Sequence, residues 1–287
     1  MSSAHVIADY EASGHRFEAA GVGSFVLDRG AGEAVVCMHG VPTSSFLYRK
    51  VVAELAARGM RGVAFDLPGL GFADRPADFD YTWSGLGRFS VAAVDALGLE
   101  RFHLVVHDIG GPIGFELAAA MPDRVLSMTL LNTLVEADTF RRPWSMEPFA
   151  IRGLRRLWLG SMSKPVFRAI MYLQGIKDRG CMTADEIGAY VDLLKRHDRG
   201  RAFLKIMSGF ERTPEKTRLY EGAVRDCPYP VQVVWGVDDP ALKYSVQGQQ
   251  ARRITGVSEV YTVPGKHFLQ EDQAPAIAER VAALARG

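Results

Sequence analysis

The sequence of 287 residues predicts an α/β fold, in which a mostly parallel, doubly wound sheet is interrupted by an inserted helical cap. Short apolar runs rich in β-branched residues alternate with longer amphipathic stretches, as strands and helices do in such folds. One long helical block then separates two strand-like runs. These two observations determine the predicted architecture.

The predicted strands are continuous apolar runs, which are typical of strands buried on both faces of a parallel sheet. They are Ala34–Met38, Gly62–Phe65, Phe102–Val106, Val125–Leu131 and Val231–Trp235. Between them, apolar residues recur at three- and four-residue spacing in the predicted helices Leu47–Arg58, Trp83–Leu97 and Gly111–Met121. Before this series, His15–Ala20 and Ser24–Asp28 predict an antiparallel hairpin at one edge of the sheet.

The alternation stops between Val135 and Val224, where the chain is helical and rich in arginine. A connection of about 90 residues is too long for an ordinary crossover between two strands. A further strand at Glu259–Val263 and a closing helix at Ala274–Arg286 follow it. We therefore predict a core at residues 1–134 and 226–287, and a cap at residues 135–225.

Composition limits the possible functions. The formal net charge of +1 argues against nucleic-acid binding, which needs a concentrated basic excess. No apolar run reaches the length of about 18 residues that a membrane span requires. The N-terminal segment contains acidic residues where a secretory signal needs a cationic, apolar start. Three widely spaced cysteines, Cys37, Cys181 and Cys227, are more typical of reduced thiols in a cytoplasmic protein than of disulfides or a zinc site. The sequence implies no cofactor or metal.

Polar residues follow the predicted strands, at the sheet edge where open α/β folds bind ligands. The segments are His39-Gly40-Val41-Pro42-Thr43, Asp66-Leu67-Pro68-Gly69-Leu70-Gly71, His107-Asp108-Ile109-Gly110-Gly111, Gly236-Val237-Asp238-Asp239-Pro240 and Gly265-Lys266-His267-Phe268. Asp108, Asp239 and His267 follow the nucleophile, acid and histidine order of α/β hydrolases. Asp108 would then stand on a sharp strand-to-helix turn, where the helix N-terminus favours its ionised form. The alternative for Asp108 is a simple helix N-cap, which leaves the matching Asp239 and His267 unexplained.

The segments His39-Gly40-Val41-Pro42-Thr43-Ser44-Ser45, Asp66-Leu67-Pro68-Gly69-Leu70-Gly71 and Val105-Val106-His107-Asp108 resemble haloalkane dehalogenases, with epoxide hydrolases as the nearest relatives. Val106, two residues before Asp108, fits the dehalogenase pattern better than the glycine of epoxide hydrolases and serine esterases. The resemblance covers essentially the whole core, and the cap is much less similar. It implies an α/β-hydrolase fold.

The resemblance implies that Asp108 displaces a leaving group from a saturated carbon and forms an alkyl-enzyme ester. His267 then activates a water molecule that hydrolyses the ester, while the backbone N–H groups of Val41 and Ile109 bind the oxyanion. The family spacing selects Asp239 as the acid that orients His267, with Asp238 as the alternative.

The residues that would stabilise the leaving group are not evident. Dehalogenases use a tryptophan after the nucleophile and a second cap tryptophan or core asparagine, but these core positions are Ile109 and Val41. Candidates for the pocket are His39 beside the site and the cap residues Trp144, Trp158, Tyr172 and Tyr190. Each of the cap aromatics has a simple packing role as its alternative. The later ring-opening tyrosine of epoxide hydrolases falls near Lys205-Ile206, where no tyrosine stands. An inward-facing cap arginine would match a substrate carboxylate, although an arginine run is more often a solvated face.

We therefore predict a hydrolase of haloalkane dehalogenase type that acts on a small apolar organic substrate and water. An epoxide hydrolase with the same covalent mechanism is the first alternative. A non-catalytic small-molecule binding protein is a more remote one, because a receptor does not need all three of Asp108, Asp239 and His267. An esterase with an aspartate nucleophile is weaker still, since attack on an acyl group would give an anhydride.

Overall fold

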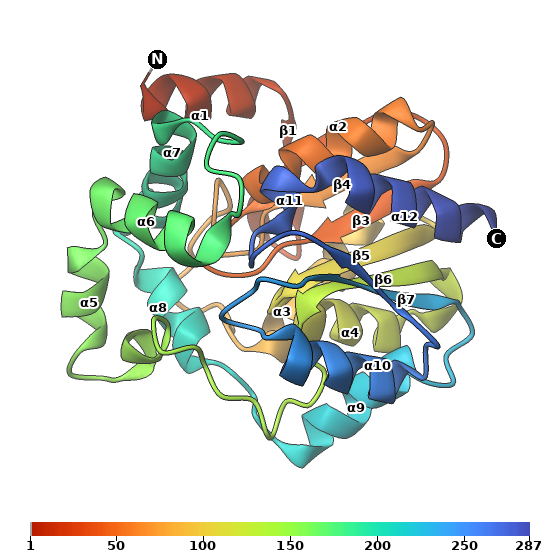
Figure 1. The fold of residues 1–287 in the computed structure, drawn as a ribbon. Coiled ribbons are helices and arrows are strands. Elements are labelled where there is room, and N and C mark those ends of the chain that lie inside the picture. Colours follow the sequence, from red (N-terminus) through yellow and green to blue (C-terminus); the bar gives the residue numbers. More distant parts are fainter. Residues whose placement is uncertain (1) are drawn as a thin grey trace.

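The computed structural model describes residues 2–287 and contains one eight-stranded sheet with the order β1-β2-β4-β3-β5-β6-β7-β8 (Figure 1). β1 and β2 form an antiparallel hairpin at one edge, β2 pairs antiparallel with β4, and the remaining neighbours are parallel. The α/β-hydrolase fold predicted from the sequence is confirmed, including the edge hairpin. The strands span His15–Ala19 (β1), Val22–Arg29 (β2), Ala34–Met38 (β3), Arg61–Phe65 (β4), Phe102–Asp108 (β5), Val125–Thr133 (β6), Val231–Gly236 (β7) and Val260–Val263 (β8).

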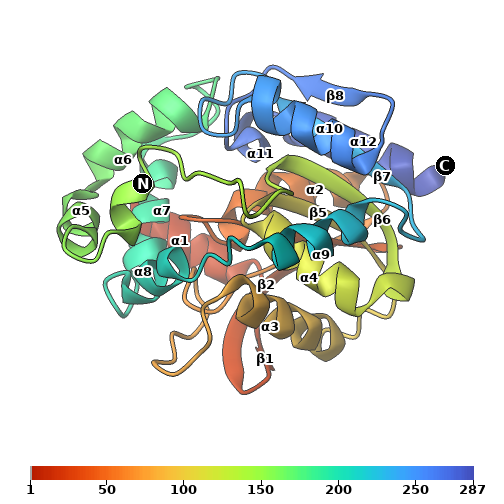
Figure 2. The same cartoon turned by 90° about the horizontal axis from the view of Figure 1, so that it is seen from below.

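Helices cover both faces of the sheet, which explains why the central strands β3 and β5 are buried over almost their whole length (Figures 1 and 2). α2 and α12 pack together on one face, whereas α3, α4, α9 and α10 lie on the other. The bounds are Arg49–Ala57 (α2), Trp83–Ala96 (α3), Gly110–Ala120 (α4), Pro214–Val224 (α9), Gln249–Thr255 (α10), Leu269–Asp272 (α11) and Ala274–Arg286 (α12). None of the helices in residues 2–287 is long and apolar enough to cross a membrane.

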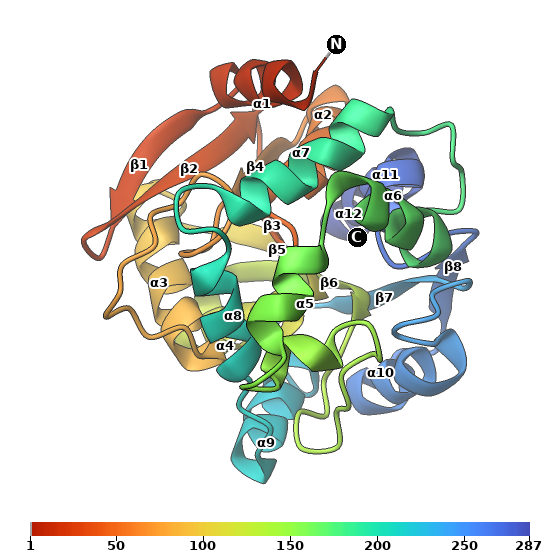
Figure 3. The same cartoon turned by 90° about the vertical axis from the view of Figure 1, so that its left-hand side faces the viewer.

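A group of short helices between β6 and β7 lies over the strand ends, as Figure 3 shows. They are Arg155–Ser161 (α5), Lys164–Ile170 (α6), a π-helical turn at Met171–Gly175, Ala184–Lys195 (α7) and Arg201–Ser208 (α8). α9 falls inside the predicted cap range of 135–225, yet it packs against α4 on the face of the sheet. By its packing α9 is therefore part of the core layer, and the insertion over the strand ends finishes before it.

The N-terminal helix α1, Ser3–Ala12, was not predicted from the sequence. Among its apolar side chains only Ile7 and Tyr10 are fully buried, so its apolar stripe is too narrow to give a clear helical period. α1 packs against α7, and the Ser3 hydroxyl donates a hydrogen bond of 2.7 Å to Asp192. Tertiary contact with the inserted helices thus stabilises a helix that the local pattern does not indicate.

Candidate active site

Asp108 stands at the sharp turn that joins β5 to α4, as the sequence predicts. Its φ of +52° lies in the left-handed region, which is strained for a residue with a side chain. The Thr133 hydroxyl donates a hydrogen bond of 2.6 Å to the Asp108 carbonyl and helps to hold this conformation. Gly110 packs so closely on the Met38 carbonyl, and Gly40 on the Asp108 carboxylate, that a Cβ at either glycine would overlap these groups.

The surroundings of Asp108 favour its carboxylate form. The backbone N–H of Val41 donates to Oδ1 at 2.9 Å, and the backbone N–H of Ile109 also contributes a hydrogen bond. Burial by itself would raise the pKa of Asp108, but hydrogen bonding to His267 and the charge of that imidazole outweigh it and lower the pKa. The backbone N–H groups of Val41 and Ile109, which the sequence analysis expects to bind the oxyanion, therefore both contact the Asp108 carboxylate.

His267 lies in the loop between β8 and α11, with its ring between two carboxylates. Its Nε2 is 3.4 Å from Asp108 Oδ2, and its Nδ1 is 2.8 Å from Asp239 Oδ2. Burial disfavours the charged imidazolium, but the negative charges and hydrogen bonds of Asp239 and Asp108 raise the pKa of His267 to about 10. The histidine is consequently protonated at neutral pH while both carboxylates are ionised.

Asp239, and not Asp238, is the carboxylate in contact with His267. Its Oδ2 also accepts a hydrogen bond of 2.7 Å from the side-chain amide of Asn132, at the end of β6. Burial would raise the pKa of Asp239, but the charge and hydrogen bond of His267 together with Asn132 lower it. Asp238 is partly exposed and pairs with Lys177 at 2.6 Å.

The remaining oxygen of Asp239 is fully engaged as well. Oδ1 accepts from the backbone N–H groups of Ala241 at 2.7 Å and Leu242 at 3.0 Å. Asn132 is held in turn, because its Oδ1 accepts from the backbone N–H of Gly236 at 2.8 Å. Asn132 was missed in the sequence, where its one signal is a polar residue at the end of an apolar strand.

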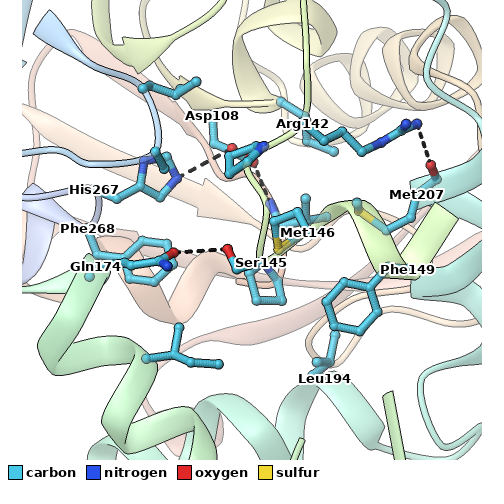
Figure 4. A pocket seen from close by; sticks show the side chains of 18 of the residues that line it. Asp108, Arg142, Ser145, Met146, Phe149, Gln174, Leu194, Met207, His267 and Phe268 are labelled. Atoms are coloured by element: carbon cyan, nitrogen blue, oxygen red, sulfur yellow. Dashed lines mark hydrogen bonds and ion pairs between the residues drawn. The ribbon is translucent and has the colours of Figure 1, made fainter. Parts of the chain in front are cut away.

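Asp108 and His267 open into a cavity of about 70 Å³ between the sheet and the inserted helices (Figure 4). This is about half the volume of a 150 Å³ cavity that accommodates benzene. It therefore suits a molecule smaller than benzene. Its wall is mostly apolar and includes Ile109, Phe140, Met146, Phe149, Met162, Phe167, Ile170, Leu194, Met207, Phe210, Leu242 and Phe268.

The tryptophans and the histidine predicted as pocket residues do not line this cavity. Trp144 is 69% exposed and points to solvent. Trp158 donates its indole N–H to the Ser145 carbonyl at 3.2 Å, so this donor is already engaged within the protein. His39 is buried beneath the site, where its Nδ1 lies 2.9 Å from the Gly40 carbonyl and its Nε2 accepts the backbone N–H of Leu67.

The two predicted tyrosines also lie outside the cavity wall. Tyr190 is buried in α7, and its hydroxyl donates to the Glu271 carboxylate at 2.5 Å. Glu271 also pairs with Arg49 and Lys50, so Tyr190 belongs to a buried charge cluster between an inserted helix and the core. The Tyr172 ring packs against the Arg179 guanidinium, whose central carbon is 5.2 Å from the ring centre. The sequence could not distinguish these positions, because a helix places aromatic residues on several faces.

His107, which precedes Asp108, has a structural position. Burial, followed by the neighbouring charge of His267, lowers the pKa of His107 to about 3. Its neutral ring has Nε2 at 2.7 Å from the His267 carbonyl. His107 thereby helps to hold the loop that carries His267.

Apart from Asp108 and His267, sequence reasoning did not single out the polar residues of the cavity wall. They are Ser145, Gln174 and Arg142, all from the inserted segment. The Ser145 hydroxyl donates to Gln174 Oε1 at 3.0 Å, and Arg142 donates to the Met207 carbonyl at 2.8 Å. No motif marks Ser145 or Gln174, and Arg142 is one of many cap arginines.

Within the part of the chain that the structure describes, no group of histidine, cysteine and acidic side chains could hold a metal ion.

Comparisons with known proteins agree with the fold. A family model described as alpha/beta hydrolase fold matches residues 33–170. The curated protein "Uncharacterized hydrolase YNR064C" of Saccharomyces cerevisiae is 28% identical over 266 residues, which cover 87% of this chain and 88% of that protein. "Haloalkane dehalogenase 2" of Mycobacterium tuberculosis is 27% identical over 265 residues, which cover 89% of this chain and 88% of that protein. A crystallised epoxide hydrolase mutant of Vigna radiata superposes with a TM-score of 0.77 at 20% identity, over 95% of this chain and 98% of that chain.

The chain is therefore a hydrolase with the α/β-hydrolase fold. Its similarity to a haloalkane dehalogenase and, in fold, to an epoxide hydrolase agrees with the branch that the sequence motifs resemble.

Proposed function

We propose that this hydrolase acts as a dehalogenase on a small apolar haloalkane, through a covalent ester on Asp108. The observation that carries the proposal is the contact of His267 with both Asp108 and Asp239 at the edge of an apolar cavity. A carboxylate nucleophile needs no base to become reactive, since it is already ionised. Asp108 attacks the saturated carbon in line, the new C–O bond forms, and the leaving group departs with the bonding electrons.

The electrostatics of the site explain why His267 acts only in the second step. Two ionised carboxylates hold the proton on His267 before the reaction. Alkylation of Asp108 turns one of them into a neutral ester, so the pKa of His267 falls and the imidazole releases its proton to solvent. The neutral Nε2 then accepts a proton from water as that water attacks the ester carbonyl.

The hydrolytic step uses groups that already contact the Asp108 carboxylate. The N–H groups of Val41 and Ile109 stabilise the negative oxygen of the tetrahedral intermediate. Collapse of the intermediate releases an alcohol, restores the Asp108 carboxylate and leaves His267 protonated again. In total, one haloalkane and one water give one alcohol, one halide and one proton.

Epoxide hydrolysis by the same covalent mechanism is the second candidate, and the fold similarity to an epoxide hydrolase supports testing it. A non-catalytic binding protein is less consistent with the site, because ligand binding requires neither the buried Asp239 nor the strained Asp108. The proposal includes a cytoplasmic location, which the three free cysteines support.

Trapping the ester tests this proposal directly. His267→Gln keeps the nucleophile but removes the base, so incubation with 1-bromopropane is expected to add one propyl group to the protein. Mass spectrometry of the intact protein and of its peptides would detect the group on Asp108. The matched control Asp108→Asn should acquire no mass. A folded His267→Gln protein that forms no adduct with 1-bromopropane or with propylene oxide would refute the covalent mechanism.

A further inference from the structure

An in-line displacement needs a group that stabilises the leaving atom on the side of the carbon opposite the nucleophile. The residues expected for that task are not in the cavity wall: Trp144, Trp158 and both candidate tyrosines lie elsewhere. The leaving group must then meet other side chains of the wall, which is otherwise almost entirely apolar.

Figure 4 shows Ser145 and Gln174 lining this cavity together with Asp108 and His267, and in this view the two polar cap residues lie below Asp108. The Ser145 hydroxyl donates a hydrogen bond of 3.0 Å to Gln174 Oε1. Its NH₂ group has no hydrogen-bond partner in residues 2–287 and is therefore the half of the amide left for a molecule in the cavity. The Ser145 hydroxyl thus holds the Gln174 amide at the cavity wall.

Both residues are fixed through their backbones. The Ser145 carbonyl accepts the indole N–H of Trp158, and the Gln174 carbonyl accepts the backbone N–H of His267 at 3.1 Å. Gln174 belongs to the π-helical turn Met171–Gly175, a form that is rare and often found at functional sites. The backbone of Gln174 is therefore held against the loop that carries His267.

We propose that the Gln174 amide, oriented by Ser145, is the hydrogen-bond donor for the leaving group, and that this group is a halide. The inference rests on the function proposed above and names the substrate class of the same site. A halide leaves as a stable anion, so a donor that keeps its own proton is sufficient. The C–X bond breaks, the halide takes the electron pair, and the amide N–H hydrogen-bonds to it without transferring a proton.

An epoxide places a different demand on the same position. Its oxygen would leave as a strongly basic alkoxide and needs a proton from an acid such as a tyrosine, whose ordinary pKa is about 10. No tyrosine, lysine or cysteine is found among the described residues that line the cavity. His267 is protonated, but at 3.4 Å from Asp108 it lies on the side of attack. The Gln174 amide and the Ser145 hydroxyl do not give up protons at neutral pH.

Arg142 is the other donor in the wall and must be tested beside Gln174. Its side chain is only 6% exposed, and its Nε is buried with no hydrogen-bond partner in residues 2–287. Its guanidinium, however, stacks 4.4 Å from the centre of the Phe210 ring and donates to the Met207 carbonyl. Figure 4 shows the contact of Arg142 with Met207, which lies away from Gln174.

The test measures ester formation in the His267→Gln background, where the chemical step is isolated from hydrolysis. The probes 1-chloropropane, 1-bromopropane and 1-iodopropane share one carbon skeleton, and propylene oxide represents the epoxide class. Gln174→Met removes the amide but keeps a chain of similar length and the backbone carbonyl that holds His267. Tyr172→Phe, outside the cavity, is the control, and Arg142→Met examines the competing donor.

Gln174→Met is expected to slow ester formation from 1-chloropropane about 100-fold, the effect of losing one preorganised donor. The loss should be about tenfold smaller with 1-iodopropane, because the charge on iodide is more diffuse and depends less on hydrogen bonding. Tyr172→Phe should change none of the rates, and propylene oxide should give no ester. This change in halide preference separates a leaving-group donor from a structural residue, which would slow all three reactions equally.

An equal loss with all three halides, or no loss, would overturn the role of Gln174 while leaving the ester mechanism intact. A change in halide preference that appears in Arg142→Met, and not in Gln174→Met, would also overturn the role of Gln174. Ester formation from propylene oxide as fast as from 1-chloropropane would overturn the assignment to halides. If Gln174→Met does not fold, Ser145→Ala takes its place, with the same pattern expected at about tenfold for chloride. Absence of any ester in His267→Gln itself would instead refute the proposed function.

Discussion

Replacing Asp239 by asparagine should stop the proposed reaction at the ester. The Asp239 carboxylate accepts four hydrogen bonds, two on Oδ1 from the N–H groups of Ala241 and Leu242 and two on Oδ2 from Asn132 and His267. An asparagine has one acceptor oxygen, so its NH₂ must face one of these pairs of donors. The mismatch of buried donors is expected to lower the free energy of unfolding by about 2–4 kcal/mol.

The catalytic effect follows from the imidazole tautomer. If the new NH₂ faces His267, Nδ1 must present its lone pair, and the ring proton moves to Nε2 beside Asp108. Such an imidazole cannot accept a proton from the hydrolytic water, and the equivalent substitution in a serine protease triad lowers kcat about 10⁴-fold. Ester formation needs no base and should fall much less.

Rapid quenching followed by mass spectrometry measures both steps with 1-bromopropane. Asp239→Asn should accumulate the propyl ester on Asp108, with hydrolysis slower by about 10³–10⁴-fold. Asp238→Asn is the matched control and should hydrolyse the ester at the wild-type rate, because Asp238 pairs with Lys177 at the surface. Hydrolysis by Asp239→Asn within tenfold of wild type, or a larger defect in Asp238→Asn, would refute the reasoning.

Further predictions concern stability and the nucleophile. The pKa of His267 is raised from 6.5 to about 10 in the folded protein, so its contribution to stability is complete below pH 6.5 and is lost as the pH rises through about 10. Urea unfolding should therefore show a gap between wild type and His267→Gln that narrows from pH 7 to pH 10, and a constant gap would contradict this. Glu271→Ala leaves the buried charge of Arg49 without a main partner and should lower the unfolding free energy by about 3–5 kcal/mol, measured by the same method, whereas an unchanged midpoint would count against it. Gly40→Ala places a methyl group on the Asp108 carboxylate and should reduce ester formation at least 100-fold with the far-ultraviolet circular dichroism unchanged; near-normal ester formation would show that the carboxylate can move aside.

The strand ends explain why so much of the site could be predicted. In a parallel sheet the carboxyl ends of neighbouring strands meet at one edge, so Asp108, Asp239 and His267 can be brought together although they are far apart in sequence. The choice between Asp238 and Asp239 was not available from composition or periodicity. It depends on which side chain the turn after β7 directs inward, and Asn132 on the neighbouring strand contributes to holding it there.

The inserted segment was less predictable for a physical reason. Its helices are short, and its aromatic residues point in several directions, so residue type alone does not reveal which side chains reach the cavity. Trp158 and Tyr190 carry the chemistry expected of leaving-group donors, but their polar hydrogens are engaged with Ser145 and Glu271. Gln174 has no motif and yet lines the cavity.

The sequence by itself determined the α/β class and the inserted helical segment, since apolar period and strand length are local properties. The more specific α/β-hydrolase fold was implied by the resemblance of the motifs that follow the strands. The sequence also identified the turn that carries Asp108 and the order of the candidate triad. Only the tertiary structure decided which polar groups face the cavity, because that depends on the docking of the inserted helices on the strand ends. The cavity wall therefore contains Ser145 and Gln174, and not the aromatic donors that the sequence suggested.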